Sequence, residues 1–194
     1  MRKSSWLIGL GSALILGGAA CLAWQFWLQH ERADAQRHAK EWLDRRSAVP
    51  RPAPASPVRR GDVVAEIDIP RLQVSVMVFE GDDLGILAKG AGHIPGTALP
   101  GTALPSGSGN IGIAAHRDTY FRPLRSVHAN DVISLKTAAG TSRYMVTETK
   151  IVRPSDIGVL APVPGRDLTL VTCYPFFYFG SAPERFIVHA RKVG

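Results

Sequence analysis

Short runs in which apolar and polar residues alternate dominate the chain from Gly61 onward. Turns rich in Gly, Pro, Asp and Asn separate these runs, and such spacing favours a β-barrel or a β-sandwich. The predicted strands are Val63 to Ile69, Val74 to Phe79, Ile111 to Ala115, Val132 to Leu135, Tyr144 to Val152, Leu168 to Cys173 and Phe186 to Ala190. Two connections, Asp82 to Ala88 and Phe121 to Val127, are predicted to be short helices. The fold class is therefore mainly β.

The first part of the chain has a different pattern. Residues 6–28 form one apolar run broken only by Gln25 and small residues, and about 20 such residues cross a bilayer as a helix. The run is too long for an ordinary signal peptide, and no small-x-small cleavage site interrupts it. The sequence thus predicts a cytoplasmic N-terminus at residues 1–5 and an uncleaved transmembrane signal anchor at residues 6–28.

Residues 29–60 are predicted to be a stalk between this anchor and a single folded domain at residues 61–194. Gln29 to Arg46 mixes charges and has no Gly or Pro, which favours a continuing helix, and Val49 to Pro57 is a proline-rich spacer. The formal net charge is +7. Residues 1–60 hold ten Lys/Arg against four Asp/Glu, whereas the remaining residues hold thirteen against twelve. A folded domain with so little net charge argues against a nucleic-acid binder.

Three residues with useful chemistry stand at the ends of predicted strands. Cys173 ends one strand and is the only cysteine outside the N-terminal apolar run, His116 directly follows another strand, and Arg185 precedes the last one. A free thiol has a pKa of roughly 8.5, and a neighbouring imidazolium or guanidinium stabilises its anion. Histidine can also protonate a leaving amine, and arginine can hold an oxyanion. Each residue alone has an ordinary structural interpretation, but the set indicates a cysteine nucleophile.

The residues around these positions resemble those of a sortase, and most closely a class D sortase. The resemblance spans about Gly61 to Val193. It rests on Thr169-Leu170-Val171-Thr172-Cys173 followed by Tyr174-Pro175, on Gly112 to Asp118, on Gly92 to Gly96, on Phe121 to Leu124, and on Arg185 twelve residues after the cysteine. It implies a closed sortase-type β-barrel of about seven to eight strands with short connecting helices, preceded by an N-terminal transmembrane helix.

The resemblance also implies a membrane-anchored cysteine transpeptidase. Such an enzyme cleaves a C-terminal LPxTG-like sorting signal of secreted proteins and transfers the acyl group to an amine acceptor of the cell envelope. Cys173 would be the nucleophile, His116 the general acid and base, and Arg185 the ligand of substrate and oxyanion. Thr172 matches a family threonine that helps shape the oxyanion site. The extracytoplasmic position of the catalytic domain rests on the resemblance, because the basic residues flanking residues 6–28 alone would place that domain inside.

An aromatic segment follows the cysteine. Tyr174, Phe176, Phe177 and Tyr178 could line a groove for an extended peptide, or they could pack the loop onto the barrel, and the sequence leaves both interpretations open. Asp118 would share a strand face with His116 if that strand continued, and it could equally belong to a turn. The cysteine and the scattered histidines of the domain lack paired metal-ligand spacing. The sequence therefore predicts no metal and no cofactor.

One loop contains a direct repeat, since Gly96 to Pro100 recurs as Gly101 to Pro105. Loops tolerate added length at small entropic cost, which favours a neutral insertion over a role in substrate selection.

Two other function classes stay open. One is another extracytoplasmic cysteine enzyme, either a peptidase or a peptidoglycan L,D-transpeptidase. The latter is expected to carry a His-Gly-Cys-Arg-like cluster, whereas Thr172 and Tyr174 flank Cys173 here. The other class is a non-catalytic, membrane-tethered binding barrel, which has no need of the Cys, His and Arg set.

Overall fold

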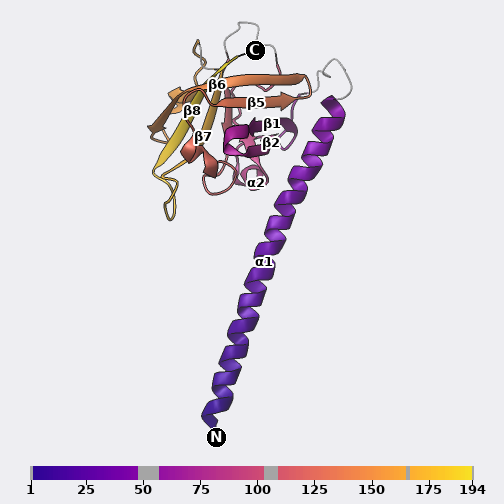
Figure 1. Ribbon diagram of the computed structural model, residues 1–194, viewed down its shortest axis with the longest axis vertical. Helices are drawn as coiled ribbons and strands as arrows, with labels where there is room; N and C mark the ends of the chain where they lie inside the picture. The colour runs from indigo at the N-terminus through magenta and orange to yellow at the C-terminus, as the bar shows by residue number, and fades with distance from the viewer. Residues whose placement is uncertain (1, 48–56, 103–108, 165–166, 194) are drawn as a thin grey trace. The chain divides into compact units, whose positions relative to one another are not determined.

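The computed structural model describes residues 2–47, 57–102, 109–164 and 167–193, with side chains from residue 14 onward. One helix, α1 (Arg2–Ser47), precedes a part of the chain that is rich in strands (Figure 1). The described residues form eight strands: β1 (Val63–Ile69), β2 (Val74–Glu80), β3 (Ala91–His93), β4 (Ile111–Ala114), β5 (Val132–Thr137), β6 (Gly140–Val152), β7 (Leu168–Tyr174) and β8 (Glu184–Lys192). Their connections contain η1 (Pro70–Leu72), α2 (Leu84–Leu87), η2 (Arg122–Ser126) and η3 (Ile157–Leu160).

The chain divides into two compact units, Met1–Ala35 and Gln36–Gly194. Across the described part of the chain, no helix combines the length and the apolar character needed to cross a membrane. The span expected at residues 6–28 therefore stays a prediction from the sequence. Most of the proline-rich spacer expected at residues 49–57 lies outside the described residues.

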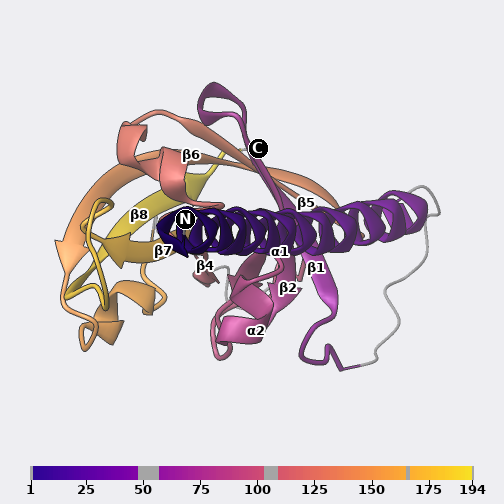
Figure 2. The ribbon, with the colours of Figure 1, turned by 90° about the horizontal axis from the view of Figure 1, so that it is seen from below.

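The strands close into a barrel in the order β1-β2-β3-β4-β7-β8-β6-β5, with β5 pairing back onto β1. Two pairs are parallel, β2 with β3 and β4 with β7, and the others are antiparallel. Figures 1 and 2 show β6, β7 and β8 grouped on one side of the barrel, with β1 and β2 on another. The prediction of a closed barrel, mainly β with short connecting helices, is confirmed.

Alternation along the strands fills the barrel interior. In β1, Ala65, Ile67 and Ile69 are fully buried and belong to one continuous apolar core. The same period of two places the other core-facing strand residues inside, because successive side chains of a strand point to opposite faces. They include Val74, Val76, Val78, Ile111, Ile113, Ile133, Leu135, Tyr144, Val146, Leu168, Leu170, Val188 and Ala190. This core fixes the register of the strands that carry the site.

The outer face of β2 is also apolar, and the end of α1 covers it. Met77 and Phe79 form a second apolar cluster with Ala39 and Leu43 of α1 and with Ile86 of α2. Both faces of such an apolar strand are expected to be covered, because each Å² of apolar surface left exposed to water loses about 25 cal/mol of stabilising free energy. The last turns of α1, from Gln36 onward, are therefore part of the barrel unit and begin well before the boundary at residue 61 expected from the sequence.

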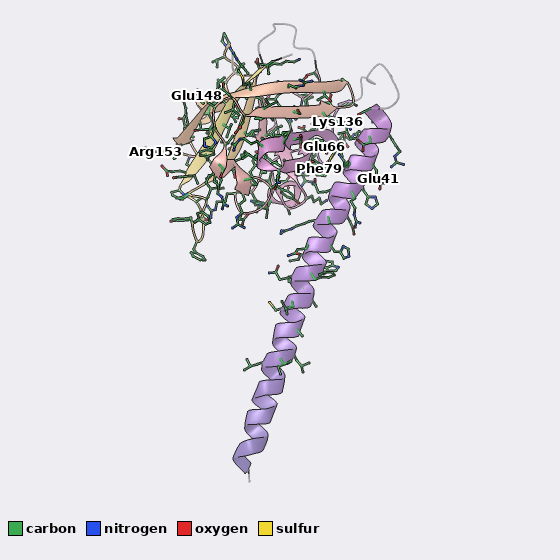
Figure 3. The ribbon with its side chains drawn as sticks, viewed as in Figure 1. Glu41, Glu66, Phe79, Lys136, Glu148 and Arg153 are labelled. Atoms are coloured by element: carbon green, nitrogen blue, oxygen red, sulfur yellow. The ribbon has the colours of Figure 1, made fainter. Side chains whose placement is uncertain are left out.

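Polar contacts reinforce this packing. Lys40 of α1 forms an ion pair with Glu66, a buried carboxylate on the outer face of β1 that also accepts a hydrogen bond from Ser75. Hydrogen bonding to Glu66 raises the pKa of Lys40 above its usual value. One helical turn further on, Asp44 lies 2.5 Å from the Lys136 amine of β5. Figure 3 shows Glu66 and Lys136 beside these turns of the helix.

All seven predicted strands are present, but one strand, β3, was not predicted. β3 has only three residues, Ala91–His93, and its central glycine removes the alternation that marks a strand. Glycine is required there, because a Cβ on Gly92 would lie 2.2 Å from the Gly81 carbonyl oxygen. The structure also extends β6 and β8 beyond their predicted ends, and the second predicted helix is a 3₁₀ helix, η2.

Candidate active site

Strand β7 lies between β4 and β8 in the barrel, and the three predicted catalytic residues lie on or directly after these three strands. In the antiparallel pair of β7 and β8, Cys173 stands directly opposite Arg185. Side chains of directly opposed residues project from the same face, with Cβ atoms about 4.5–5.5 Å apart. The register therefore places the arginine on one side of the thiol.

The parallel pairing of β4 with β7 brings the segment that leads to His116 alongside the strand of Cys173. Ala114 is paired with Val171, and the ladder continues for one residue beyond β4, because the Ala115 amide donates to the Val171 carbonyl at 3.2 Å. His116 is the next residue of this segment, and the same register continued by two residues would place it level with Cys173. The strands thus pair Cys173 with Arg185 and hold the residue before His116 against β7.

A turn anchored in the core fixes the backbone that follows the histidine. The Phe121 amide donates to the His116 carbonyl at 3.0 Å, and the Phe121 side chain is completely buried. Asp118 is exposed within this turn. Strand β4 ends at Ala114, so the continued strand that would have placed Asp118 beside the imidazole does not form.

Thr172 points into the barrel, since it shares the inward face of β7 with Leu168 and Leu170. Its hydroxyl donates to the Ala115 carbonyl at 2.8 Å and is buried. The side chain therefore ties β7 to the residue directly before His116. A role of Thr172 in the oxyanion site stays a prediction.

The three catalytic candidates are half-buried, so a ligand can reach them. In the described residues no hydrogen bond joins Cys173 to His116, and the Arg185 Nη1 donates instead to the carbonyls of Glu184 at 2.9 Å and Ala182 at 3.3 Å. Catalytic hydrogen bonds are often long or absent in unliganded enzymes and tighten with substrate. This arrangement can supply a nucleophile, a proton carrier and a forked cation at one edge of the barrel.

The aromatic segment after Cys173 divides into two parts. Tyr174 and Phe176 pack with Phe186 at the start of β8, with ring centroids 6.3 Å and 5.3 Å from the Phe186 ring. Phe177 is 75% exposed and Tyr178 is 48% exposed. The first pair therefore packs the loop onto the barrel, whereas the rings of the second pair are exposed at the surface.

Sequence reasoning missed Arg117, the residue next to the histidine. Its Nη2 donates to the Tyr178 carbonyl at 2.8 Å and to the Gly180 carbonyl at 3.2 Å. The guanidinium also lies 5.8 Å from the centre of the Tyr178 ring. The sequence did contain a signal for Arg117, namely that this charged residue directly follows the candidate acid and base, His116.

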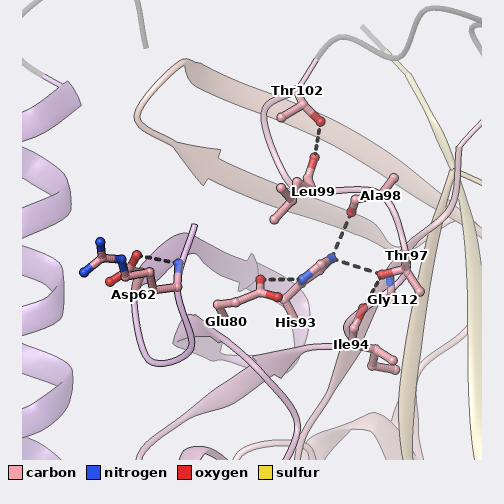
Figure 4. A network of polar contacts seen from close by, with 10 residues as sticks. Asp62, Glu80, His93, Ile94, Thr97, Ala98, Leu99, Thr102 and Gly112 are labelled. Carbon is pink, nitrogen blue, oxygen red and sulfur yellow. Dashed lines mark hydrogen bonds and ion pairs between the residues drawn. The ribbon is translucent and has the colours of Figure 1, made fainter. Parts of the chain in front are cut away.

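His93 has a structural role in β3, as Figure 4 shows. Its Nδ1 lies 2.7 Å from a Glu80 carboxylate oxygen, and its Nε2 lies 3.0 Å from both the Ala98 carbonyl and the Thr97 hydroxyl. The Thr97 hydroxyl in turn accepts a hydrogen bond from the Gly112 amide at 3.0 Å. Because both ring nitrogens are engaged, His93 holds the loop before β4 in place and has no nitrogen left for catalysis.

Neither a metal centre nor a disulfide is visible in the described residues. No group of three or more His, Cys, Asp or Glu side chains there could hold a metal ion. Cys21 and Cys173 are both free. The absence of a cofactor stays a prediction. Of the duplicated loop, Gly101 is described and would meet the Thr137 hydroxyl at 2.7 Å if it carried a Cβ, but residues 103–105 lie outside the described residues.

Comparison with known proteins identifies the family. Residues 67–193 match the sortase domain family. The chain is 32% identical over 134 residues to Sortase D of Bacillus subtilis and 32% identical over 202 residues to Sortase SrtE1 of Streptomyces coelicolor, which cover 69% and 95% of this chain. Because this family model covers most of the barrel unit, it defines the class of protein. The chain belongs to the sortase family.

Solved structures agree with this assignment. A Clostridium perfringens Sortase D5 transpeptidase superposes with a TM-score of 0.67 at 26% identity, covering 85% of this chain and 99% of its own. Sortase A from Corynebacterium diphtheriae gives a TM-score of 0.61 at 26% identity, with 84% of each chain covered. The chain matches 65% of the length of the Bacillus subtilis relative and 56% of that of the Streptomyces coelicolor relative.

Proposed function

We propose that the protein is a cysteine transpeptidase that cleaves a C-terminal LPxTG-like sorting signal of secreted proteins and joins the new carboxyl end to an amine of the cell envelope. The observation that carries the proposal is the strand register: Arg185 is paired with Cys173, and β4, which ends two residues before His116, pairs with the strand that carries Cys173. Membership of the sortase family supports it, as does the Sortase D5 transpeptidase among the similar structures.

The reaction follows from the chemistry of the three groups. The Cys173 thiolate attacks the scissile carbonyl carbon, and Arg185 stabilises the oxyanion with its forked donors. The peptide C–N bond then breaks, and the protonated imidazole of His116 gives its proton to the leaving amine. A thioester remains on Cys173. An incoming amine attacks this thioester, His116 takes up its proton, and the thiolate leaves.

The proposal requires the strand that carries Cys173 to be held in place and its thiol to be accessible, and two observations support it. The Thr172 side chain is buried and donates to the Ala115 carbonyl at 2.8 Å, so the residue before Cys173 is tied to the segment that leads to His116. Cys173, on the opposite face of the strand, is half-buried. A site built on strands holds catalytic groups more precisely than a site built on loops alone.

The test uses both cysteines of the chain. The full protein is incubated with a synthetic peptide that carries the sorting signal, and mass spectrometry locates the acyl adduct. Cys173→Ala should abolish both the adduct and peptide cleavage, while Cys21→Ala, the matched control, should keep both, since Cys21 lies in α1 outside the barrel unit. Substantial turnover by Cys173→Ala would remove the proposed mechanism.

The acceptor step distinguishes the alternatives. A transpeptidase forms an amide when an amine such as triglycine is added, whereas a plain cysteine peptidase gives only the free acid. A peptidoglycan L,D-transpeptidase would act on stem peptides and leave the sorting peptide intact, and a binding barrel would form no adduct at all.

Attachment to the membrane is a separate proposal, supported by the apolar run at residues 6–28. We propose a single-pass protein whose catalytic domain is extracytoplasmic. Fractionation of cells that express the full chain should place it in the membrane pellet, and externally added protease should digest the barrel in cells stripped of their wall. Recovery in the soluble fraction would overturn this proposal without affecting the proposed chemistry.

A further inference from the structure

The loop that joins β7 to β8, residues 175–183, begins two residues after Cys173 and ends two residues before Arg185. We call it the β7–β8 loop. The position of this loop therefore affects the surroundings of Cys173 and Arg185 and of any peptide that binds between these two residues. Arg117, from the turn after β4, donates to two carbonyls of this loop, those of Tyr178 at 2.8 Å and Gly180 at 3.2 Å.

The tip of the loop gains little from packing. Phe177 is 75% exposed, and Phe179 is fully exposed. Little apolar surface is buried there, so little of the hydrophobic free energy that holds other loops is available. Hydrogen bonds to the backbone from a charged donor are stronger than those between neutral groups. The contacts of Arg117 are thus a principal restraint on residues 178–180.

The backbone segment that carries Arg117, residues 115–121, is held at both ends. The Ala115 amide donates to the Val171 carbonyl at 3.2 Å, and the buried Phe121 anchors the far end of the turn. Arg117 also follows His116 directly in the chain. One side chain therefore links the histidine segment to the loop that runs between the nucleophile and the arginine.

Arg125 offers a comparison within the same protein. Its guanidinium carbon lies 5.5 Å from the centre of the Phe177 ring. That contact involves an exposed ring and provides no hydrogen bond to the loop backbone among the described contacts. Arg125 is therefore the matched control for Arg117: it is a cation near the same loop, but no described hydrogen bond joins it to the loop backbone.

We infer that Arg117 is a positioning residue, which holds the β7–β8 loop in the place where it binds the sorting peptide. The inference rests on the proposed function and deepens it. The Arg117 side chain donates to the loop backbone, and among the described contacts none joins it to the side chains of the three catalytic candidates. Its loss should weaken peptide binding and leave the chemistry of Cys173 intact.

The experiment compares Arg117→Ala, Arg117→Lys and Arg125→Ala in the full chain. For Arg117→Ala, KM for the sorting peptide should rise about tenfold with kcat within about threefold, the signature of lost binding in both ground and transition states. Arg117→Lys should recover only part of the affinity, since an ammonium lacks the forked donors. Arg125→Ala should keep KM within about twofold.

A second measurement needs no turnover. Amide hydrogen exchange of a peptide covering residues 176–182 should become about fivefold faster in Arg117→Ala and stay unchanged in Arg125→Ala, because exchange reports local opening. Alkylation of Cys173 by iodoacetamide should proceed at the wild-type rate in both variants.

Specific outcomes overturn the inference. Unchanged exchange in Arg117→Ala, or a fall in kcat at constant KM, would show that Arg117 does not act by positioning the loop. These results differ from failure of the proposed function, in which the wild type itself would neither cleave the peptide nor form an adduct on Cys173.

Discussion

The packing of the end of α1 on the barrel leads to a sharp prediction about stability. Leu43 is only 1% exposed and contacts an apolar cluster that includes Met77, Phe79 and Ile86. Truncating a buried leucine to alanine costs about 2–5 kcal/mol. Leu43 lies between a helix and the outer face of the barrel, where neighbours can partly close the gap, so we expect Leu43→Ala to cost about 2–3 kcal/mol.

This loss should be visible as a lower melting temperature. For a unit of the size of Gln36–Gly194, 1 kcal/mol corresponds to about 2–4 °C, so Leu43→Ala should lower Tm by about 4–12 °C. Alanine is a better helix former than leucine, so the change reports packing and not helix propensity. The assay is thermal unfolding of the full chain in detergent, followed by circular dichroism.

Glu41→Ala is the matched control, since Glu41 is an exposed residue of the same helix (Figure 3). Its Tm should stay within about 2 °C of the wild type, as for most surface substitutions. Peptide cleavage by Leu43→Ala at 25 °C should keep its wild-type kcat, because β3 and β4 separate β2 from β7 in the barrel. Equal melting temperatures for the two variants would refute the packing of α1 on the barrel.

Two further predictions concern the site and its surroundings. His116→Ala and Arg185→Ala should each lower the rate of peptide cleavage at least ~100-fold, and Arg185→Lys should recover only part of it; a near wild-type rate in a steady-state assay would contradict the assigned role. Asp131→Asn should lower the free energy of unfolding by about 1–3 kcal/mol at pH 7, because Arg71 and the His128 amide bond to this buried carboxylate. The hydrogen bond from Arg71 lowers the pKa of Asp131 below its usual 3.8, so the stabilisation is present above the unfolded-state pKa and is lost as the pH falls through the lower folded-state pKa. The free energy of unfolding, measured by urea denaturation, should therefore decrease less steeply between pH 7 and pH 3 for Asp131→Asn than for the wild type. Parallel plots of this free energy against pH for the two proteins would contradict this origin of the acid sensitivity.

The sequence alone predicted most strands of the barrel and placed its candidate catalytic residues at strand ends. Alternation is a local property, so Val63–Ile69 and Leu168–Tyr174 could be recognised one strand at a time. The same local reading placed Cys173, His116 and Arg185 at strand ends. It failed for Ala91–His93, which is too short and too rich in glycine to show alternation.

The tertiary structure decided which strand ends are neighbours. β4 and β7 are far apart in the chain, and their parallel pairing brings the segment that leads to His116 alongside the strand of Cys173. It also decided that Tyr174 and Phe176 pack against β8 whereas Phe177 is exposed.

Long-range contacts also assigned the last turns of α1 to the barrel and brought Arg117 onto the β7–β8 loop. In the sequence of β2, Met77 and Phe79 alternate with inward-facing valines, which indicates that another segment packs on the outer face of this strand. This pattern did not say which segment packs there. Such contacts depend on which strands pair and in what register, a choice that the free energy of the whole core makes and that no single segment encodes.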